Sequence, residues 1–130
     1  MSWRAGIEQN ARVSSMNPEV RPNPAVSVIA PLAGFYPSVY AGAPWWFLDA
    51  PEAIRRYRAA VTETAGFART SGFIDDTRAF CSIPARHDMS RRLDCGYLAE
   101  LVVTHRLDED EALATAHDLV AVNPKVAFKL

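Results

Sequence analysis

The chain has 130 residues, 49% apolar and 22% charged, which suits one modest globular domain. Its net charge of −1 comes from 14 basic and 15 acidic residues, so a polyanion-binding surface, and with it nucleic-acid binding, is disfavoured. No apolar run approaches the ~18 residues of a membrane span, and no secretory signal is visible. No membrane partner is therefore expected. Cys81 and Cys95 form no disulfide pattern and suggest reduced thiols in a cytoplasmic protein.

The first 31 residues are predicted to form an irregular lead-in to a domain that spans residues 32–130. Val26–Ala30 is expected to add a brief extended piece within this lead-in. The remainder is polar and rich in proline, which interrupts helices and weakens strands, at Pro18, Pro22, Pro24 and Pro31.

A strand, an aromatic loop and a helix are predicted next. Ser38–Ala41 favours a short strand because it is apolar and lies between a proline and a glycine. An aromatic cluster that contains Trp45 follows directly. Asp49 and Glu52 then have the spacing of a capping box, and a helix that ends near Gly66 is expected. Its apolar face is formed by residues at helical spacing, namely Ile54, Tyr57 and Val61.

The next stretch carries the sharpest chemical signal. Gly72–Ile74 is a second short strand candidate, and Asp75, Asp76 and Arg78 follow it. Because side chains alternate along an extended segment, Asp76 and Arg78 are expected to point to one side and Asp75 to the other. Two strands joined by a helix indicate parallel pairing, and α/β barrels carry catalytic residues at the carboxyl ends of their strands. A carboxylate and a fixed cation are therefore predicted to face one pocket.

The last third of the chain is predicted to be helical. A helix from about Pro84 to about His105 is indicated by apolar residues that recur four apart, at Met89, Leu93, Tyr97 and Leu101. Asp108 and Glu111 form another capping box at the start of a shorter helix, which Pro124 is expected to end or kink.

Five motifs are specific in combination: APWWFLD at 43–49, TETAGF at 62–67, GFIDDTRAFCSIPARHD at 72–88, RR-x-DC at 91–95 and LDEDEA at 107–112. Together they resemble the C-terminal portion of uronate (glucuronate) isomerase, a family of the amidohydrolase superfamily. The resemblance covers roughly residues 33–130. It implies the last βα units of a (β/α)8 TIM-type barrel followed by C-terminal helices, mostly helical as an isolated chain, with Ser38–Gly42 as the seventh strand and Gly72–Ile74 as the eighth.

The resemblance also implies an activity and a set of site residues. The activity is aldose–ketose isomerisation of hexuronates, D-glucuronate to D-fructuronate and D-galacturonate to D-tagaturonate. Asp76 matches the family's proton-transferring acid and a ligand of a divalent metal, with zinc the expected ion, and Arg78 matches an arginine that touches the substrate. Trp45, Arg86 and His87 are further candidates for substrate binding.

Two features limit these expectations. The family's His-x-His metal pair has no counterpart in the sequence, and a complete barrel needs ~250 residues. The chain is therefore expected to be inactive alone and to pair with the remaining barrel part or with itself. The alternative is a non-catalytic remnant or a small interaction domain.

The site residues also have structural interpretations. The carboxylates of Asp75 and Asp76 could cap a turn, and Arg78 could be solvated. His87 could be an exposed helix residue, and Trp45 could pack a core.

Overall fold

The computed structural model describes residues 24–42, 50–75 and 77–130, and of residues 24, 25 and 77–79 it describes only the backbone. These ranges are mostly helical, as expected, and contain α2 (Pro24–Phe35), α3 (Pro51–Ala65), α4 (Ile83–Val103), α5 (Glu109–Ala121) and α6 (Asn123–Phe128). Two short 3-10 helices, η2 (Phe67–Arg69) and η3 (Thr77–Ser82), lie between α3 and α4. No helix in the described ranges has both the length and the apolar character to cross a bilayer.

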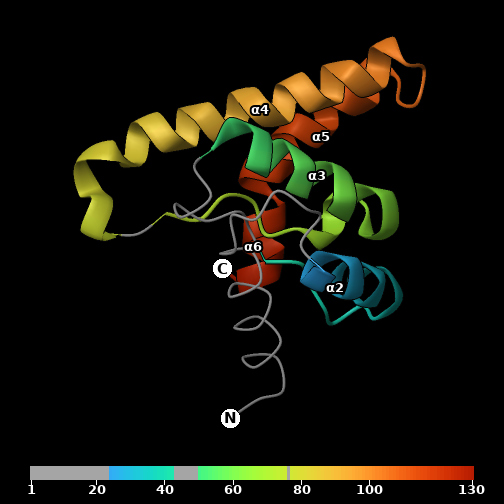
Figure 1. Cartoon of the computed structure of the whole chain (residues 1–130), viewed down its shortest axis with the longest axis horizontal. Coiled ribbons are helices and arrows are strands. Elements are labelled where there is room, and N and C mark those ends of the chain that lie inside the picture. The colour runs from blue at the N-terminus through green and yellow to red at the C-terminus, as the bar shows by residue number, and fades with distance from the viewer. Residues whose placement is uncertain (1–23, 43–49, 76) are drawn as a thin grey trace.

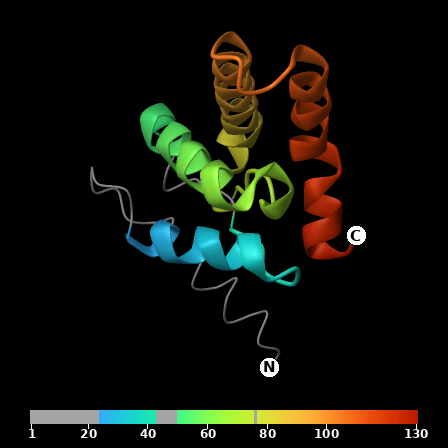
Figure 2. The same cartoon turned by 90° about the vertical axis from the view of Figure 1, so that its right-hand side faces the viewer.

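Each helix packs on its neighbour in the sequence, from α2 on α3 to α5 on α6. In Figure 1, α4 and α5 run together across the molecule, and α3 lies between them and α2. Figure 2 shows α4 and α5 standing side by side, joined by a turn at one end. The short η2 contacts both α3 and α5, so the chain between α3 and α4 lies against the C-terminal half of the molecule.

Helix α3 confirms the predicted apolar face and C-terminal end. Ile54, Tyr57 and Val61 are buried, and the helix stops at Gly66, whose φ of 74° is favourable for glycine. Its first residue is Pro51, and Ala50 occupies the N-cap position without a side-chain capping hydrogen bond. The predicted cap, Asp49, lies outside the described residues.

The C-terminal helices also follow their sequence signals. Helix α4 has a proline in its first turn, as predicted, and it ends where His105 adopts a left-handed conformation with φ of 57°. Asp108 caps α5, because its Oδ1 accepts a hydrogen bond from the Glu111 amide at 2.8 Å. Pro124 lies at the start of α6, directly after α5 ends, which confirms the predicted interruption.

The prediction for Val26–Ala30 was wrong, because this stretch lies inside α2. Its buried residues Val26, Ala30 and Ala33 have helical rather than alternating spacing, and they pack toward α3. The prolines were given too much weight: Pro24 lies in a first turn, where proline is tolerated, and Pro31 is accommodated within the helix. The expected boundary between residues 31 and 32 falls within this helix.

The two predicted strands are not formed as strands within the described ranges. Instead, Ala41 and Thr70 form an isolated parallel bridge, in which the Ala41 amide donates to the Arg69 carbonyl at 2.8 Å. The parallel direction matches the expectation, and the described pairing begins at Thr70, earlier than Gly72–Ile74. Ile74 is also a bridge residue, so the second predicted strand is reduced to isolated bridges. Gly72 itself has a φ of 80°, which is not extended, and a lone pair of short strands has little stability without further neighbours.

Two apolar clusters hold the helices together. The first lies among α2, α3 and the segment that follows α2, and consists of Val26, Ala30, Ala33, Val39, Ala41, Tyr57 and Val61. The second joins α4 to α5 through Leu98, Ala112 and Leu119, against which four partly buried side chains pack, namely Phe67, Val102, Leu107 and Ala116. Phe67 brings η2 into this second cluster, so the chain between α3 and α4 is held from both sides.

Candidate functional site

The predicted site residues divide into those that the structure describes and those that it does not. Trp45 and Asp76 lie outside the described residues, and of Arg78 only the backbone is described, within η3. Arg86 and His87 lie near the start of α4. The described structure therefore gives the neighbouring chain segments, and the roles assigned to all five residues stay predictions.

Arg86 forms an ion pair with Asp75, the acid to which the sequence gave no chemical role. Its Nη1 donates to Asp75 Oδ1 at 3.1 Å, and the two side chains are 18% and 3% exposed. A carboxylate removed from water in this way needs a partner of opposite charge to remain ionised at low cost. Because the two residues are eleven positions apart, the pair fastens the segment before η3 onto α4.

His87 makes a second contact between the same two parts of the chain. Its ring lies edge-on to that of Phe73, with centroids 5.1 Å apart and planes at 87°. Phe73 and Asp75 are two residues apart, and both contact successive residues of α4. This geometry is that of an extended segment up to Asp75, with one side against the helix. The predicted alternation does not continue to Arg78, because η3 begins at Thr77 and Arg78 lies in this 3-10 helix and not on an extended segment.

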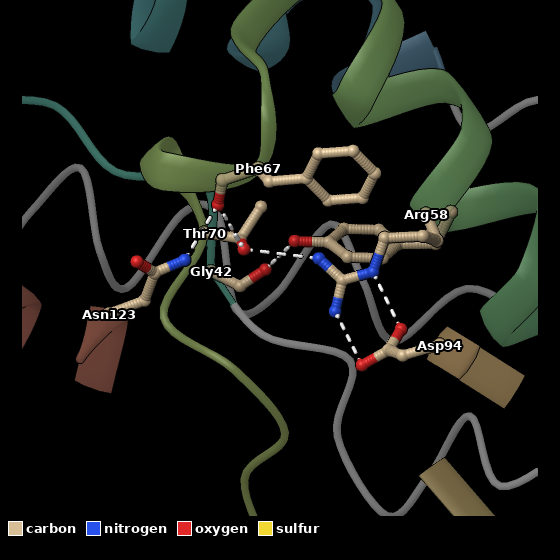
Figure 3. Close-up of polar contacts among 7 residues, drawn as sticks. Gly42, Arg58, Phe67, Thr70, Asp94 and Asn123 are labelled. Atoms are coloured by element: carbon tan, nitrogen blue, oxygen red, sulfur yellow. Dashed lines mark hydrogen bonds and ion pairs between the residues drawn. The ribbon is translucent and has the colours of Figure 1, made fainter. Parts of the chain in front are cut away.

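A buried polar network outside the predicted site joins α3, α4 and the segment at Thr70. Arg58 on α3 donates through Nε and Nη2 to both carboxylate oxygens of Asp94 on α4, at 2.8 and 3.1 Å. Its Nη1 donates to Thr70 Oγ1 at 3.0 Å (Figure 3). The side chains of Arg58 and Asp94 are 1% and 9% exposed. Three elements therefore meet at one guanidinium.

A sequence signal for this pair did exist. Arg58 has the same helical spacing as the buried residues Ile54 and Val61, and Asp94 has the same spacing as Leu98 and Leu101. A charged residue within the apolar face of each of two neighbouring helices is costly unless the two pair. Such a pattern is a reason to look for a buried ion pair.

Two further contacts fix the chain around Thr70 and Gly42. Tyr57 donates its hydroxyl proton to the Gly42 carbonyl, and burial raises the pKa of this phenol to about 12. From the C-terminal side, Asn123 Nδ2 donates to the Phe67 carbonyl at 2.8 Å (Figure 3). The two segments that pair at Ala41 and Thr70 are thus held by α3 and by α6.

Gly72 adds a steric constraint to the same segment. A Cβ atom at this position would lie 2.9 Å from the Leu119 carbonyl oxygen and 3.2 Å from Pro124 Cγ. Only glycine allows this approach and the positive φ together. The segment that leads to Asp75 therefore lies directly against the junction of α5 and α6.

The described residues do not by themselves form a metal site. Within residues 24–42, 50–75 and 77–130, no three His, Cys, Asp or Glu side chains come together in an arrangement that could hold an ion. His105 and His117 are exposed, at the end of α4 and on α5. The ligand that the sequence predicted, Asp76, lies outside the described residues, so metal binding stays a prediction.

Comparisons with known proteins give a consistent result. A family model described as glucuronate isomerase matches residues 14–128, which extends the expected resemblance toward the N-terminus. Uronate isomerase from Cutibacterium acnes is 67% identical over 102 residues, and uronate isomerase from Brucella canis is 62% identical over the same length. Each match covers 78% of this chain and 22% of the relative.

A solved structure is similar as well. The crystal structure of glucuronate isomerase from Caulobacter crescentus superposes with a TM-score of 0.74 at 55% sequence identity. The match covers 78% of this chain and 21% of the other. The chain therefore spans about a fifth of the length of the proteins to which it is similar.

Proposed function

Because the chain belongs to the glucuronate isomerase family, we propose that it contributes catalytic residues to the aldose–ketose isomerisation of hexuronates. The observation that carries this proposal is the family match across residues 14–128, together with 67% identity to a uronate isomerase. The substrates would be D-glucuronate and D-galacturonate, and the products D-fructuronate and D-tagaturonate. Since the chain spans 22% of that relative, it would supply part of a site and not the whole.

In this proposal Asp76 and Arg78 perform the chemistry. Isomerisation moves a proton between adjacent carbons through an enediol-like intermediate, so it needs a base beside the substrate and positive charge where the oxyanion develops. Asp76 would be the base, and Arg78 would stabilise the oxyanion. The ion pair between Asp75 and Arg86 supports this choice, because it gives Asp75 a structural role on α4. Trp45 and His87 would line the substrate side. The pair with Asp75 gives Arg86 a structural role in this proposal, in place of the substrate contact that the sequence predicted.

The parallel bridge between Ala41 and Thr70 supports a proposal for the fold of the complete protein. The segments 38–42 and 70–74 are joined through α3 and run in the same direction, which is the arrangement of a βαβ unit. They would be the seventh and eighth strands of a (β/α)8 barrel completed by further barrel units. The expected divalent metal, with zinc as the proposed ion, would have Asp76 as one ligand, and its other ligands would lie outside the described residues.

Exposed apolar side chains support the proposal that the chain has a protein partner. They lie on α2, α5 and α6, and include Val28, Phe35, Leu113, Val120 and Val126. Remaining barrel units, or a second copy of the chain, would cover part of this surface. A cytoplasmic location stays a prediction.

A chimeric enzyme tests the proposed function. The 102 matching residues of the Cutibacterium acnes uronate isomerase are replaced by those of this chain, and turnover of glucuronate and galacturonate is measured. We expect the chimera to be active and Asp76→Asn to lower turnover by several orders of magnitude, because it removes the proton acceptor. Arg78→Lys should also be severe, because an ammonium does not reproduce a planar fork of donors.

Asp75→Asn is the matched control in the same chimera. It changes the carboxylate next to Asp76, which is paired with Arg86. Turnover by the folded enzyme should stay within about tenfold of the parent, which corresponds to ~1.4 kcal/mol in barrier height. The purified chain alone should show no turnover above a heat-killed control, with zinc or manganese added. An inactive chimera, or a chimera in which Asp75→Asn is the dead variant, would contradict the proposal. Complete inactivity would favour the non-catalytic alternative.

A further inference from the structure

Two adjacent residues of α3 hold both chain segments that lead to the predicted site. Tyr57 donates to the Gly42 carbonyl, which directly precedes the stretch that contains Trp45. Arg58 donates to Thr70, in the segment that leads toward the acids at 75 and 76. Figure 3 shows the contact from Arg58 to Thr70, with Gly42 nearby. One turn of one helix therefore contacts both approaches to the predicted site.

The hydrogen bonds around Arg58 have a fixed direction. A guanidinium can only donate, so Thr70 Oγ1 accepts from it and gives its own proton to the Phe67 carbonyl, at 2.9 Å. The same carbonyl accepts from Asn123. Asp94 binds the guanidinium through two oxygens, which leaves the buried cation little rotational freedom. The position of Thr70 is thus determined by α3, α4 and α6 together.

Tyr57 is an equally fixed donor. Burial raises its pKa to about 12, so the hydroxyl stays protonated throughout the neutral range and continues to donate to Gly42. Between the two α3 contacts, the Ala41 amide bonds the Arg69 carbonyl at 2.8 Å. The two segments are therefore joined to each other and also to a common support.

We infer that Tyr57 and Arg58 are positioning residues, which set the separation of segments 39–42 and 67–75 and thereby the geometry of the isomerisation site. The catalytic consequence rests on the proposed function, whereas the positioning itself can be measured in this chain. Neither residue is argued to touch the substrate. Each acts through the backbone of a segment that carries predicted site residues.

Hydrogen exchange on the full chain tests the positioning. Tyr57→Phe removes the hydrogen bond to Gly42, and Thr70→Val removes those to Arg58 and Phe67, while both keep the side-chain shape. Both should speed exchange of the Ala41 amide by about tenfold or more, while amides in the middle of α4 change by less than about threefold. Glu100→Gln is the control, because its partner Arg55 also joins α3 to α4 but contacts neither segment. It should leave Ala41 exchange within about threefold of the parent.

Two outcomes of the exchange experiment would overturn the inference. The first is an unchanged rate for Ala41 in both variants. The second is a rise at Ala41 no larger than the rise in α4, because this would be a loss of global stability and not a local release.

Kinetics in the chimera test the catalytic consequence. Thr70→Val should lower kcat by about tenfold, with KM within about twofold, because the site residues are displaced and substrate binding is largely kept. Thr70→Ser restores the hydroxyl and should return kcat to within about twofold of the parent. An unchanged kcat in folded Thr70→Val, beside an active parent, would overturn the catalytic part. An inactive parent chimera would instead contradict the proposed function, and the exchange rates would still decide the positioning.

Discussion

The region around α3 and the hairpin of α4 and α5 are stabilised in different ways. Around α3, a buried guanidinium, a buried carboxylate and two hydroxyl groups connect segments that are distant in the sequence. The hairpin relies on helix caps and on a small apolar cluster of Leu98, Ala112 and Leu119. The hairpin is stabilised by helix capping and by buried apolar surface. The α3 region is stabilised by individual hydrogen bonds and an ion pair, each of which needs one particular partner residue. Substitutions should therefore have unequal effects in the two regions.

The largest effect is expected at the buried ion pair. Arg58→Ala should lower the free energy of unfolding by about 3–5 kcal/mol, because it leaves Asp94 buried without its cation. Urea denaturation followed by circular dichroism measures this change. The double variant Arg58→Met/Asp94→Leu removes both charges and should recover a large part of the loss.

Arg55→Ala provides the comparison for this prediction. The pair between Arg55 and Glu100 also joins α3 to α4, but the two side chains are 42% and 47% exposed. Its removal should have no measurable effect on stability. Equal losses for Arg55→Ala and Arg58→Ala would show that burial does not distinguish the two pairs.

A pH-dependent effect of intermediate size is expected at Tyr57. Its pKa is raised from 10.0 to about 12 by burial, so the folded chain keeps a proton that the unfolded chain loses. The associated stability is present below pH 10 and is lost as pH rises to about 12, for a total of about 2–3 kcal/mol. Urea denaturation at several pH values between 9 and 12 measures the slope.

Tyr57→Phe should reduce this alkaline loss without abolishing it, because burial also raises the pKa of Tyr97. It should also lower stability at neutral pH, since the Gly42 carbonyl loses its donor. Identical pH slopes in the parent and in Tyr57→Phe would mean that Tyr57 does not cause the alkaline loss.

Two glycines are expected to give smaller changes in stability than Arg58→Ala, with opposite signs. A Cβ atom at Gly34 would lie 2.5 Å from the Thr64 carbonyl oxygen, so Gly34→Ala should destabilise by about 1–3 kcal/mol through overlap of α2 with α3. Gly96 lies in α4 and has nothing within 4 Å of the same position. Gly96→Ala should stabilise by about 0.5–1 kcal/mol through helix propensity. Thermal unfolding of both variants measures the contrast, and a loss at Gly96 would contradict it.

The local part of this fold was predictable from the sequence. Helical spacing, the capping residue Asp108 and the terminating Gly66 predicted α3, α4 and α5 because these signals act within a few residues. Helix α2 was missed because its prolines suggested disruption, although its buried residues have helical spacing. The strands were over-predicted because a strand needs neighbours that local sequence does not provide.

The site was predictable only in part. The spacing of Arg58 and Asp94 within two apolar helix faces was a signal for buried charges. It did not identify the pair, because the partners are 36 residues apart and a local pattern does not show which helices are neighbours.

The alternation argument assumed an extended segment through Arg78, but the 3-10 helix η3 begins at Thr77 because the chain turns there into α4. The contact between Asp75 and Arg86 therefore describes Asp75 alone. The assignments of Asp76 and Arg78 rest on motif and family, and they remain predictions until the variants are measured.

The hydrogen bond from Asn123 to the Phe67 carbonyl has a consequence for the order of folding. Most helices pack on sequence neighbours, so α4 and α5 can associate early and at low entropic cost. The Asn123 contact must close a loop of 56 residues, which costs more entropy and favours late formation. An interaction made after the transition state slows unfolding without accelerating folding. The contact between α6 and Phe67 would therefore lower the unfolding rate and leave the folding rate almost unchanged.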